Sequence, residues 1–386
     1  MDGTLSASQN RKGRFTIWAA LVLLGVSCLT LLGLVALFSA SHSIYNDDYI
    51  FLRKQLVWIV ISLVFAFGTF IISVETLRKY VWLLCALIII GLILTLIPGI
   101  GITVNGAQRW IGFDGLRVQV SEFSKPILVL ALAHYLAVNQ RHIDLFFKGF
   151  LYPCSMIGLV CGLIILQPDY GTAVLCGVVG FGLIFLSGVR LIYLVPTVMS
   201  SLGLFALMVY NNPVRLSRIT SFLNIEENLS TGAYQLWQGI LAFGTGGING
   251  VGLGNGRQQF SFLPEAHTDF IFAIIGEEMG LIITLLVLFL FLSIFIIGMV
   301  QLRRAPNLYH FLLGAGALLF MILQSIINIG VVTGCLPTKG MSLPFISYGG
   351  SNLVVMFILI GLVLNLFEKW ARPVISNARE ITVIKD

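Results

Sequence analysis

Long apolar runs alternate with short polar segments along nearly the whole chain. A helix of about 20 apolar residues crosses the roughly 30 Å hydrocarbon core of a bilayer. The runs approach or exceed that length, so the pattern predicts about ten transmembrane helices within one domain, residues 15–370. The predicted spans are 15–40, 55–74, 81–98, 119–138, 149–166, 171–187, 191–210, 269–300, 308–333 and 350–367.

The composition excludes the other fold classes. Hydrophobic residues make up 58% of the chain and charged residues 10%, against ordinary charged usage of about 25%. So few charges cannot cover a soluble surface, and so much apolar material excludes disorder. The apolar stretches are continuous, whereas a membrane β-barrel alternates. The sequence therefore predicts an all-α polytopic membrane protein.

The basic residues indicate orientation and not a nucleic-acid partner, because they lie in short loops between the apolar runs. They predict that the polar segment 1–14 and the tail 371–386 both lie in the cytoplasm. The long connections, 99–118, 211–268 and 334–349, then face outward. Long connections in a compact domain often carry function, so we expect the working surface on the outer side. The largest of them joins the seventh and eighth helices.

Asp269 lies where the largest outer loop meets the next apolar run. Thr268 is a suitable N-cap for a helix that runs from Asp269, which would place the carboxylate near the positive helix end. Two interpretations are open: a capping carboxylate, or a functional group beside His267. Glu277 and Glu278 follow in the same run, and the helical repeat keeps all three carboxylates from facing one site. At least one glutamate is therefore expected to be a structural polar contact.

A second group of candidate residues precedes and opens the fourth predicted helix. Glu122 and Lys125 are spaced i, i+3, so they share a helix face and can pair. The pair could be a structural lock or could orient a polar substrate group. Just before it, Arg109 could hold a phosphate through its planar fork, or could simply form an interfacial pair with Trp110.

Two further segments carry possible anion ligands. The stretch 239–256 holds eight glycines, but no strand precedes it and no phosphate-loop lysine follows. Close-packed backbone is the favoured interpretation, and Arg218 ahead of it offers positive charge. The segment 334–352 combines two prolines with a Gly-Gly pair, which is typical of a broken or re-entrant stretch. Its Lys339 could face a phosphate or pair with a carboxylate.

Together these segments resemble the SEDS proteins (shape, elongation, division and sporulation), which are integral-membrane peptidoglycan glycosyltransferases. The division branch is more similar than the elongation branch. The resemblance covers all ten predicted helices in order. It is carried by NGAQRW at 105–110, SEFSK at 121–125, QPDYGT at 167–172, LPEAHTDFIFAIIGEEMG at 263–280 and LPTKGMSLPFISYGGSN at 336–352.

The resemblance implies polymerisation of lipid II with release of undecaprenyl pyrophosphate, in the bacterial cytoplasmic (inner) membrane and at the division septum. It implies a class B penicillin-binding protein, an FtsI-like transpeptidase, as partner, alongside other divisome proteins. Asp269 matches the family's essential aspartate, and Glu122 and Lys125 match a polar pair in its central cavity.

Glycosyl transfer fits these residue types. A sugar hydroxyl that attacks an anomeric carbon needs a base, and the departing pyrophosphate needs cationic support. Asp269 could be the base or could hold a divalent cation, Mg²⁺ or Mn²⁺; no organic cofactor is expected. Two alternatives remain at this point: a transporter that flips lipid-linked precursors, and a non-catalytic divisome scaffold. The candidate substrate-binding residues are Arg109, Glu122, Lys125, Arg218, His267 and Lys339.

Overall fold

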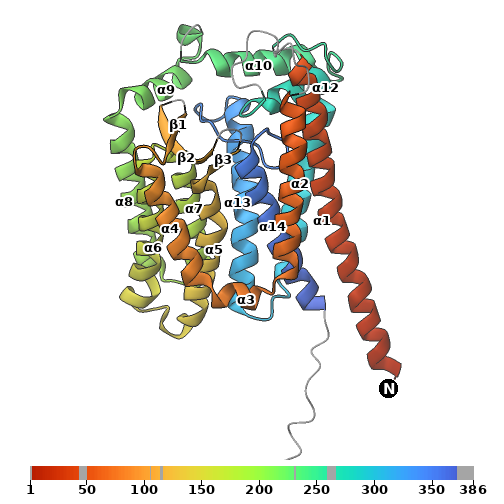
Figure 1. The fold of residues 1–386 in the computed structure, drawn as a ribbon, viewed down its shortest axis with the longest axis vertical. Coiled ribbons are helices and arrows are strands. Elements are labelled where there is room, and N and C mark those ends of the chain that lie inside the picture. The colour runs from red at the N-terminus through yellow and green to blue at the C-terminus, as the bar shows by residue number, and fades with distance from the viewer. Residues whose placement is uncertain are drawn as a thin grey trace, which may run out of the picture.

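The computed structural model describes residues 2–42, 50–104, 106–113, 116–229, 232–258 and 267–371. Long helices run roughly side by side, and a small sheet with two crossing helices covers one end of the bundle (Figure 1). We call that end the sheet end. The helices are α1 (Asp2–His42), α2 (Ile50–Ile71), α3 (Val74–Lys79), α4 (Val81–Leu96), α5 (Val120–Val138), α6 (Tyr152–Leu166), α7 (Tyr170–Leu186), α8 (Leu191–Tyr210), α9 (Pro213–Leu223), α10 (Tyr234–Gly246), α12 (Ile271–Leu302), α13 (Leu308–Val332) and α14 (Gly350–Ala371).

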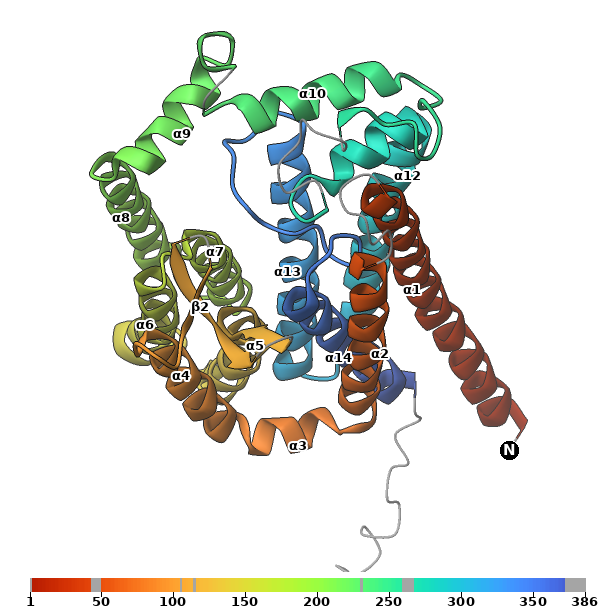
Figure 2. The ribbon, with the colours of Figure 1, turned by 45° about the horizontal axis from the view of Figure 1, so that its top comes forward.

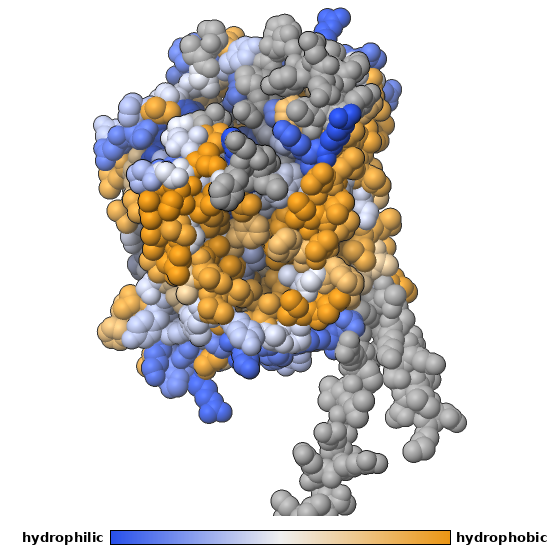
Figure 3. Space-filling view, in the orientation of Figure 1, coloured by the Kyte–Doolittle hydropathy of each residue, from blue (hydrophilic) through white to orange (hydrophobic). Residues whose placement is uncertain are grey.

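Each of the ten predicted spans is helical over most of its length. Within the described residues, seven helices are long and apolar enough to cross a membrane, and α4 and α7 are shorter apolar helices. Apolar side chains form a band around the middle of the face in Figure 3, with hydrophilic residues gathered toward both ends. Large apolar side chains of the helices, such as Val64, Leu87 and Phe289, are exposed. An apolar belt between two polar ends is the surface of a polytopic membrane protein, as predicted.

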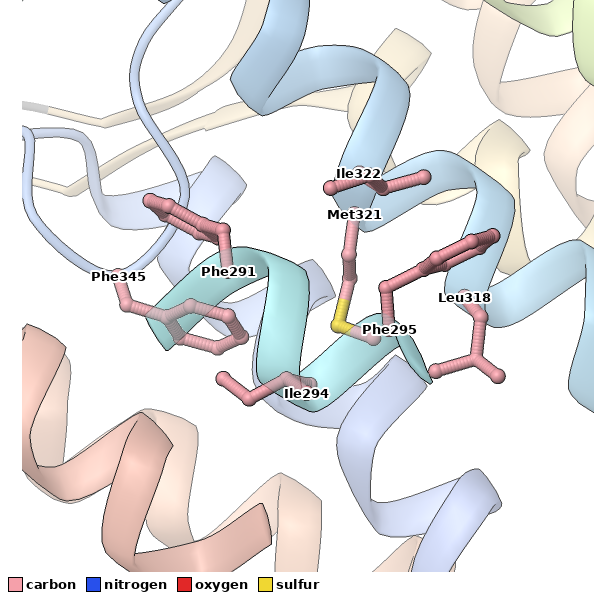
Figure 4. A pocket seen from close by; sticks show the side chains of 7 residues that line it. All are labelled: Phe291, Ile294, Phe295, Leu318, Met321, Ile322 and Phe345. Carbon is pink, nitrogen blue, oxygen red and sulfur yellow. The ribbon is translucent and has the colours of Figure 1, made fainter. Parts of the chain in front are cut away.

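The centre of the bundle is α14, which lies between α2 and α13 (Figure 2). Its side chains from Leu353 to Phe367 are almost all buried. Nearby, α12 and α13 leave a void of about 10 Å³ beneath Phe345, lined only by apolar side chains (Figure 4). A water molecule needs at least that volume together with polar partners. The void is therefore a dry packing defect and not a binding site.

The connection 99–118, which the sequence predicts only as a long connection, is mostly a three-stranded antiparallel sheet. Its strands are β1 (Ile102–Val104), β2 (Ala107–Phe113) and β3 (Leu116–Gln119). The register pairs Trp110 with Gln119, and β3 runs directly into α5. The sheet thereby fixes Arg109 at the mouth of the bundle. Helix periodicity could not show it, because these strands are only three to seven residues long.

The connection 211–268 is also more ordered than expected, since α9, a 3₁₀ turn (Glu226–Asn228) and α10 occupy much of it. Beyond it, α12 is broken at Gly280, whose φ of 75° lies in the left-handed region that glycine tolerates. The carbonyls of Glu277 and Glu278 accept hydrogen bonds from the amides of Val251 and Gly252, at 2.9 and 3.0 Å. Irregular backbone at membrane depth needs such substitute partners, and the glycine-rich segment supplies them.

Candidate functional site

Asp269 lies at the sheet end, in a turn ahead of α12. The predicted helix start at Asp269 is wrong: α12 begins at Ile271, and the residue before it, Phe270, makes no side-chain cap. The carbonyl of Asp269 accepts a hydrogen bond from Nδ2 of Asn328 at 2.8 Å. A Cβ atom placed on Gly340 would lie 2.6 Å from Oδ2 of Asp269. The carboxylate therefore lies directly over the backbone of the 333–349 segment, in a place that only glycine leaves open.

The 333–349 segment crosses the sheet end between α13 and α14 (Figure 2). The amide of Tyr348 donates to the carbonyl of His267 at 3.1 Å, and Gln55 donates to the carbonyl of Ser347 at 3.3 Å. The segment also holds Phe345 at a φ of 64°, a conformation that costs an aromatic residue about 1–2 kcal/mol. Burial of its ring against Phe357 offsets this cost. The segment is non-helical and held by specific hydrogen bonds, so the predicted break in the helical pattern is confirmed, whereas its re-entrant course stays a prediction.

Lys339 is the cation of this segment. A Cβ atom placed on Gly171 would lie 2.7 Å from Cε of Lys339 and 3.5 Å from its Nζ, and Oδ1 of Asp169 is also 3.5 Å from that point. Loss of water around Lys339 lowers its pKa from 10.5 to about 8, and the nearby Asp169 carboxylate opposes the shift. Lys339 therefore still carries its charge at neutral pH but is easily deprotonated above it.

Asp169 organises the neighbouring side of the site. Its Oδ2 accepts hydrogen bonds from Nε2 of Gln119 and Oγ of Ser121, each at 3.0 Å, and its Oδ1 caps α7 through the amide of Thr172 at 3.3 Å. Our sequence reasoning used the 167–172 motif for the resemblance but did not select Asp169 as a site residue. The available signal was an aspartate that precedes an apolar helix, which alone indicates only a cap.

Arg109 is already bound by protein groups. Its Nε donates to the carbonyl of Gln167 at 3.1 Å, another nitrogen donates to the carbonyl of Pro168, and Nη1 lies 3.8 Å from Oδ1 of Asp169. Three contacts tie strand β2 to the turn that precedes α7. Since its side chain is still 28% exposed, Arg109 places positive charge at the site but has little freedom to close around a phosphate by itself.

Glu122 and Lys125 form the predicted i, i+3 ion pair, with 2.7 Å between Lys125 Nζ and Glu122 Oε2. Both residues are buried, Lys125 completely. Nζ of Lys125 donates also to Oε1 of Gln324 at 2.8 Å, and Nε2 of Gln324 donates to the carbonyl of Ser342 at 2.8 Å. The side chain of Gln324 therefore connects the buried Glu122–Lys125 pair to the 333–349 segment.

The comparisons with known proteins identify the family. The model of a cell cycle protein family that comprises FtsW, RodA and SpoVE matches residues 19–370. This chain belongs to that family. A probable peptidoglycan glycosyltransferase FtsW of Coxiella burnetii is 41% identical over 355 residues, which are 88% of this chain and 94% of the relative. The stage V sporulation protein E of Bacillus subtilis is 37% identical over 350 residues, 90% of this chain and 95% of the relative.

Solved structures agree with the family assignment. The rod shape determining protein RodA of Thermus thermophilus superposes with a TM-score of 0.68 at 26% identity, covering 91% of this chain and 97% of RodA. A chain from a peptidoglycan synthase complex that coordinates polymerisation and crosslinking reaches a TM-score of 0.75 at 25% identity, covering 91% and 98%. The resemblance to the SEDS proteins is therefore confirmed, and several relatives carry the name of the division branch.

Two other acidic residues of this family member have a structural role. Glu277 Oε1 accepts from the amide of Arg257 at 2.8 Å, and Glu278 Oε1 accepts from Ser39 Oγ at 2.7 Å and from the amide of Gly254 at 3.0 Å. The glycine-rich segment packs so closely that a Cβ on Gly250 would lie 2.1 Å from the Glu278 carbonyl. Both predictions, structural glutamates and close-packed glycine backbone, are confirmed.

The structure does not bring all the candidate residues together. Arg218 is exposed on α9, and its guanidinium forms no ion pair with the described residues. His267 lies two residues before Asp269, and its ring packs on Phe51 at a centroid distance of 4.4 Å and near Tyr348 at 5.9 Å. The site therefore centres on Asp269, Lys339 and Asp169, with Arg109 and the buried ion pair beside them.

Among the described residues, no three His, Cys, Asp or Glu side chains lie close enough to hold a metal ion. Mg²⁺ is commonly bound through one or two carboxylates together with substrate phosphates.

Proposed function

We infer that this protein is a peptidoglycan glycosyltransferase that polymerises lipid II into glycan strands and releases undecaprenyl pyrophosphate. The observation that carries the inference is the Asp269 carboxylate over Gly340, the residue after Lys339, whose partly dehydrated side chain lies near Asp169. Glycosyl transfer to a hydroxyl requires a base and a cation within one site. This chain is similar, over most of their length, to relatives named as probable peptidoglycan glycosyltransferases, which supports the same substrate class.

Asp269 acts as the base in this proposal. An oxygen–carbon bond forms between the acceptor sugar hydroxyl and the anomeric carbon of the donor, and the hydroxyl proton passes to the Asp269 carboxylate. The bond from the anomeric carbon to the pyrophosphate oxygen breaks, and that oxygen leaves with the electron pair. Positive charge is needed where this oxygen becomes negative, and Lys339 supplies it, with Arg109 at the rim.

The lipid tails explain why the site lies at the mouths of helices. A polyprenyl chain remains in the bilayer while its pyrophosphate and sugars reach the membrane surface. Asp269 precedes α12, Asp169 precedes α7, and Lys339 lies in the 333–349 segment, which crosses the sheet end (Figure 2). In the proposed orientation this end faces the outside of the cytoplasmic membrane, and both chain termini face the cytoplasm. His267 and Arg218 are proposed to contact the sugar or peptide parts of lipid II as they enter.

A partner and a place in the cell complete the proposal. The peptidoglycan synthase complex coordinates polymerisation and crosslinking, and we propose a class B penicillin-binding protein as the transpeptidase partner here. The similarity to division-branch relatives supports a role at the septum, together with other divisome proteins. A divalent cation enters only as a companion of the substrate pyrophosphate, and no step above requires it.

A reconstituted polymerisation assay tests this function. The full-length protein and its class B partner are supplied with lipid II, and the glycan products are separated on a gel. Asp269→Asn keeps the shape of the side chain but removes the proton acceptor, so polymer should disappear. Asp144→Asn is the matched control, because Asp144 pairs at 2.9 Å with Arg190 on an exposed surface. Normal polymerisation by a folded Asp269→Asn complex would show that the base is another group.

A further inference from the structure

Asn328 is a buried amide about one turn before the C-terminal end of the apolar helix α13, and the proposed chemistry does not use it. Its side chain is 1% exposed on α13. A polar group buried in apolar surroundings is unfavourable unless it is hydrogen-bonded. Nδ2 of Asn328 donates to the carbonyl of Asp269 at 2.8 Å and also to the carbonyl of Met341. Both hydrogens of the amide are therefore used, and both acceptors belong to main chain outside helices and strands.

The orientation of this amide follows from its neighbours. If the group were flipped, its oxygen would face two carbonyl oxygens and the contact would be repulsive. In the observed orientation Oδ1 is buried and has no hydrogen-bond partner among the residues that the structure describes. The amide group therefore donates two hydrogen bonds, to two separate segments, while its oxygen accepts none from the described residues.

The two segments that Asn328 joins are those whose contact positions the carboxylate. Met341 follows Gly340, and Gly340 is the residue over which Oδ2 of Asp269 lies. Asn328 holds the Asp269 turn by one carbonyl and the Gly340 backbone by the next carbonyl along the chain. A shift of either segment would change the distance between the carboxylate and the backbone it rests on.

One helical turn earlier, Gln324 makes an equivalent set of contacts. Residues i and i+4 lie on one face of a helix, so both amides of α13 point to the same side. Gln324 accepts from Lys125 at 2.8 Å and donates to the carbonyl of Ser342 and to Asn352 Oδ1, each at 2.8 Å. Consecutive carbonyls, of Met341 and Ser342, are therefore held by consecutive turns of α13.

We propose that Asn328 is a positioning residue for the reaction: through the carbonyls of Asp269 and Met341 it fixes the Asp269 carboxylate over the 339–341 backbone. Gln324 extends the same register to the buried Lys125–Glu122 pair. The catalytic part of this inference rests on the proposed glycosyltransferase function. The alternative is a purely structural role, in which Asn328 contributes only to the stability of the fold, as interhelical amides in membrane proteins do.

Asn328→Ala in the full-length protein with its partner separates these two roles. Asn365→Ala is the matched control, because Asn365 is also buried and its Nδ2 donates to three carbonyls, of Thr69, Phe70 and Ile72, where α14 meets α2. We expect Asn328→Ala to lower kcat on lipid II at least 10-fold with KM within about 2-fold, since a small misplacement of a catalytic group has effects of this order. Asn365→Ala should lower Tm by a similar amount but leave kcat unchanged.

Hydrogen exchange provides a readout that does not need activity. Asn328→Ala should speed amide exchange in residues 267–271 and 339–343 at least 10-fold, and Asn365→Ala should not. An active wild-type complex whose kcat is unchanged by Asn328→Ala overturns the inference but leaves the proposed function standing. A wild-type complex with no polymerase activity overturns the proposed function. If amide exchange in residues 267–271 and 339–343 is also the same in Asn328→Ala as in the wild type, Asn328 does not hold these two segments either.

Discussion

Gly340→Ala is the most direct test of how Asp269 is placed. The added methyl group would lie 2.6 Å from Oδ2 of Asp269 and 3.6 Å from its Cγ. Ordinary contacts of a Cβ atom begin at about 3.4 Å. The carboxylate must therefore retreat by roughly 0.8 Å, the difference between these two distances. Since Gly340 does not have a left-handed φ, alanine itself fits the backbone, and the end of a flexible side chain can move without unfolding the turn.

The expected kinetic effect follows from this displacement. A misplacement of about 1 Å can cost about 100-fold in rate, so we expect kcat for glycan polymerisation to fall between 10- and 100-fold. That loss corresponds to roughly 1.4–2.7 kcal/mol in the activation barrier. The Tm should change little, because the substitution removes no buried contact.

Gly349→Ala is the control for the same segment. A Cβ at Gly349 would meet its nearest neighbours, Ser342 and Asn352, at 3.8–3.9 Å, which is ordinary contact. Both variants are assayed as full complexes with the class B partner, using lipid II and gel analysis of glycan chains. If Gly340→Ala and Gly349→Ala polymerise equally well, the carboxylate of Asp269 is not held in a catalytic position by this backbone.

Three further predictions concern charge, packing and the cation. Lys339 is charged in the folded protein below about pH 8 and neutral above it, whereas in the unfolded chain it stays charged up to about pH 10.5. Between these two values the unfolded chain binds one more proton, so the free energy of unfolding rises with pH. In the same range the folded protein loses the positive charge of Lys339. The polymerisation rate should fall as pH rises through 8, and Lys339→Arg should abolish that fall; an unchanged profile would contradict the role of Lys339. Gly250 has a φ of 78°, and an added Cβ would lie 2.1 Å from a carbonyl oxygen, so Gly250→Ala should destabilise the protein by at least about 3 kcal/mol. Gly244 in α10 has open space around it, so Gly244→Ala should stabilise the protein by about 0.5–1 kcal/mol, and thermal unfolding compares the two variants. Titration calorimetry should detect Mg²⁺ binding only when a lipid pyrophosphate is present, and binding to the protein alone would contradict a substrate-dependent site.

The helices could be predicted from the sequence because their physical cause is local. Each span is long and apolar enough to require helix in a bilayer, and the helical segments observed follow the predicted ranges closely. The Glu122–Lys125 pair was predictable for the same reason, since i, i+3 spacing alone brings the two side chains together. The sheet was not predictable, because its short strands pair across turns and carry no long-range period.

The centre of the site depends on contacts between segments far apart in the chain. Asp169 meets Gln119 and Arg109 only because β2 and the end of β3 lie near the turn before α7, and Gly340 meets Asp269 only because the 333–349 segment folds back across the sheet end. No spacing within any one motif encodes these distances. The N-cap predicted at Thr268 failed for a related reason: Asn328, 59 residues away, holds the Asp269 carbonyl in a turn.

The acidic residues near the sheet end show why residue type alone does not distinguish structure from catalysis. The carboxylates of Glu277 and Glu278 accept hydrogen bonds from the backbone amides of Arg257 and Gly254, so they satisfy donors of the connection that precedes α12. Asp169 receives three donors and caps a helix. Asp269 differs in how it is placed: its carboxylate lies over a glycine, while its main chain carries the anchoring bond from Asn328. Asn328 fixes the backbone of Asp269, and Gly340 fixes the position of its carboxylate oxygen. The carboxylate is therefore preorganised, as a proton acceptor in glycosyl transfer must be.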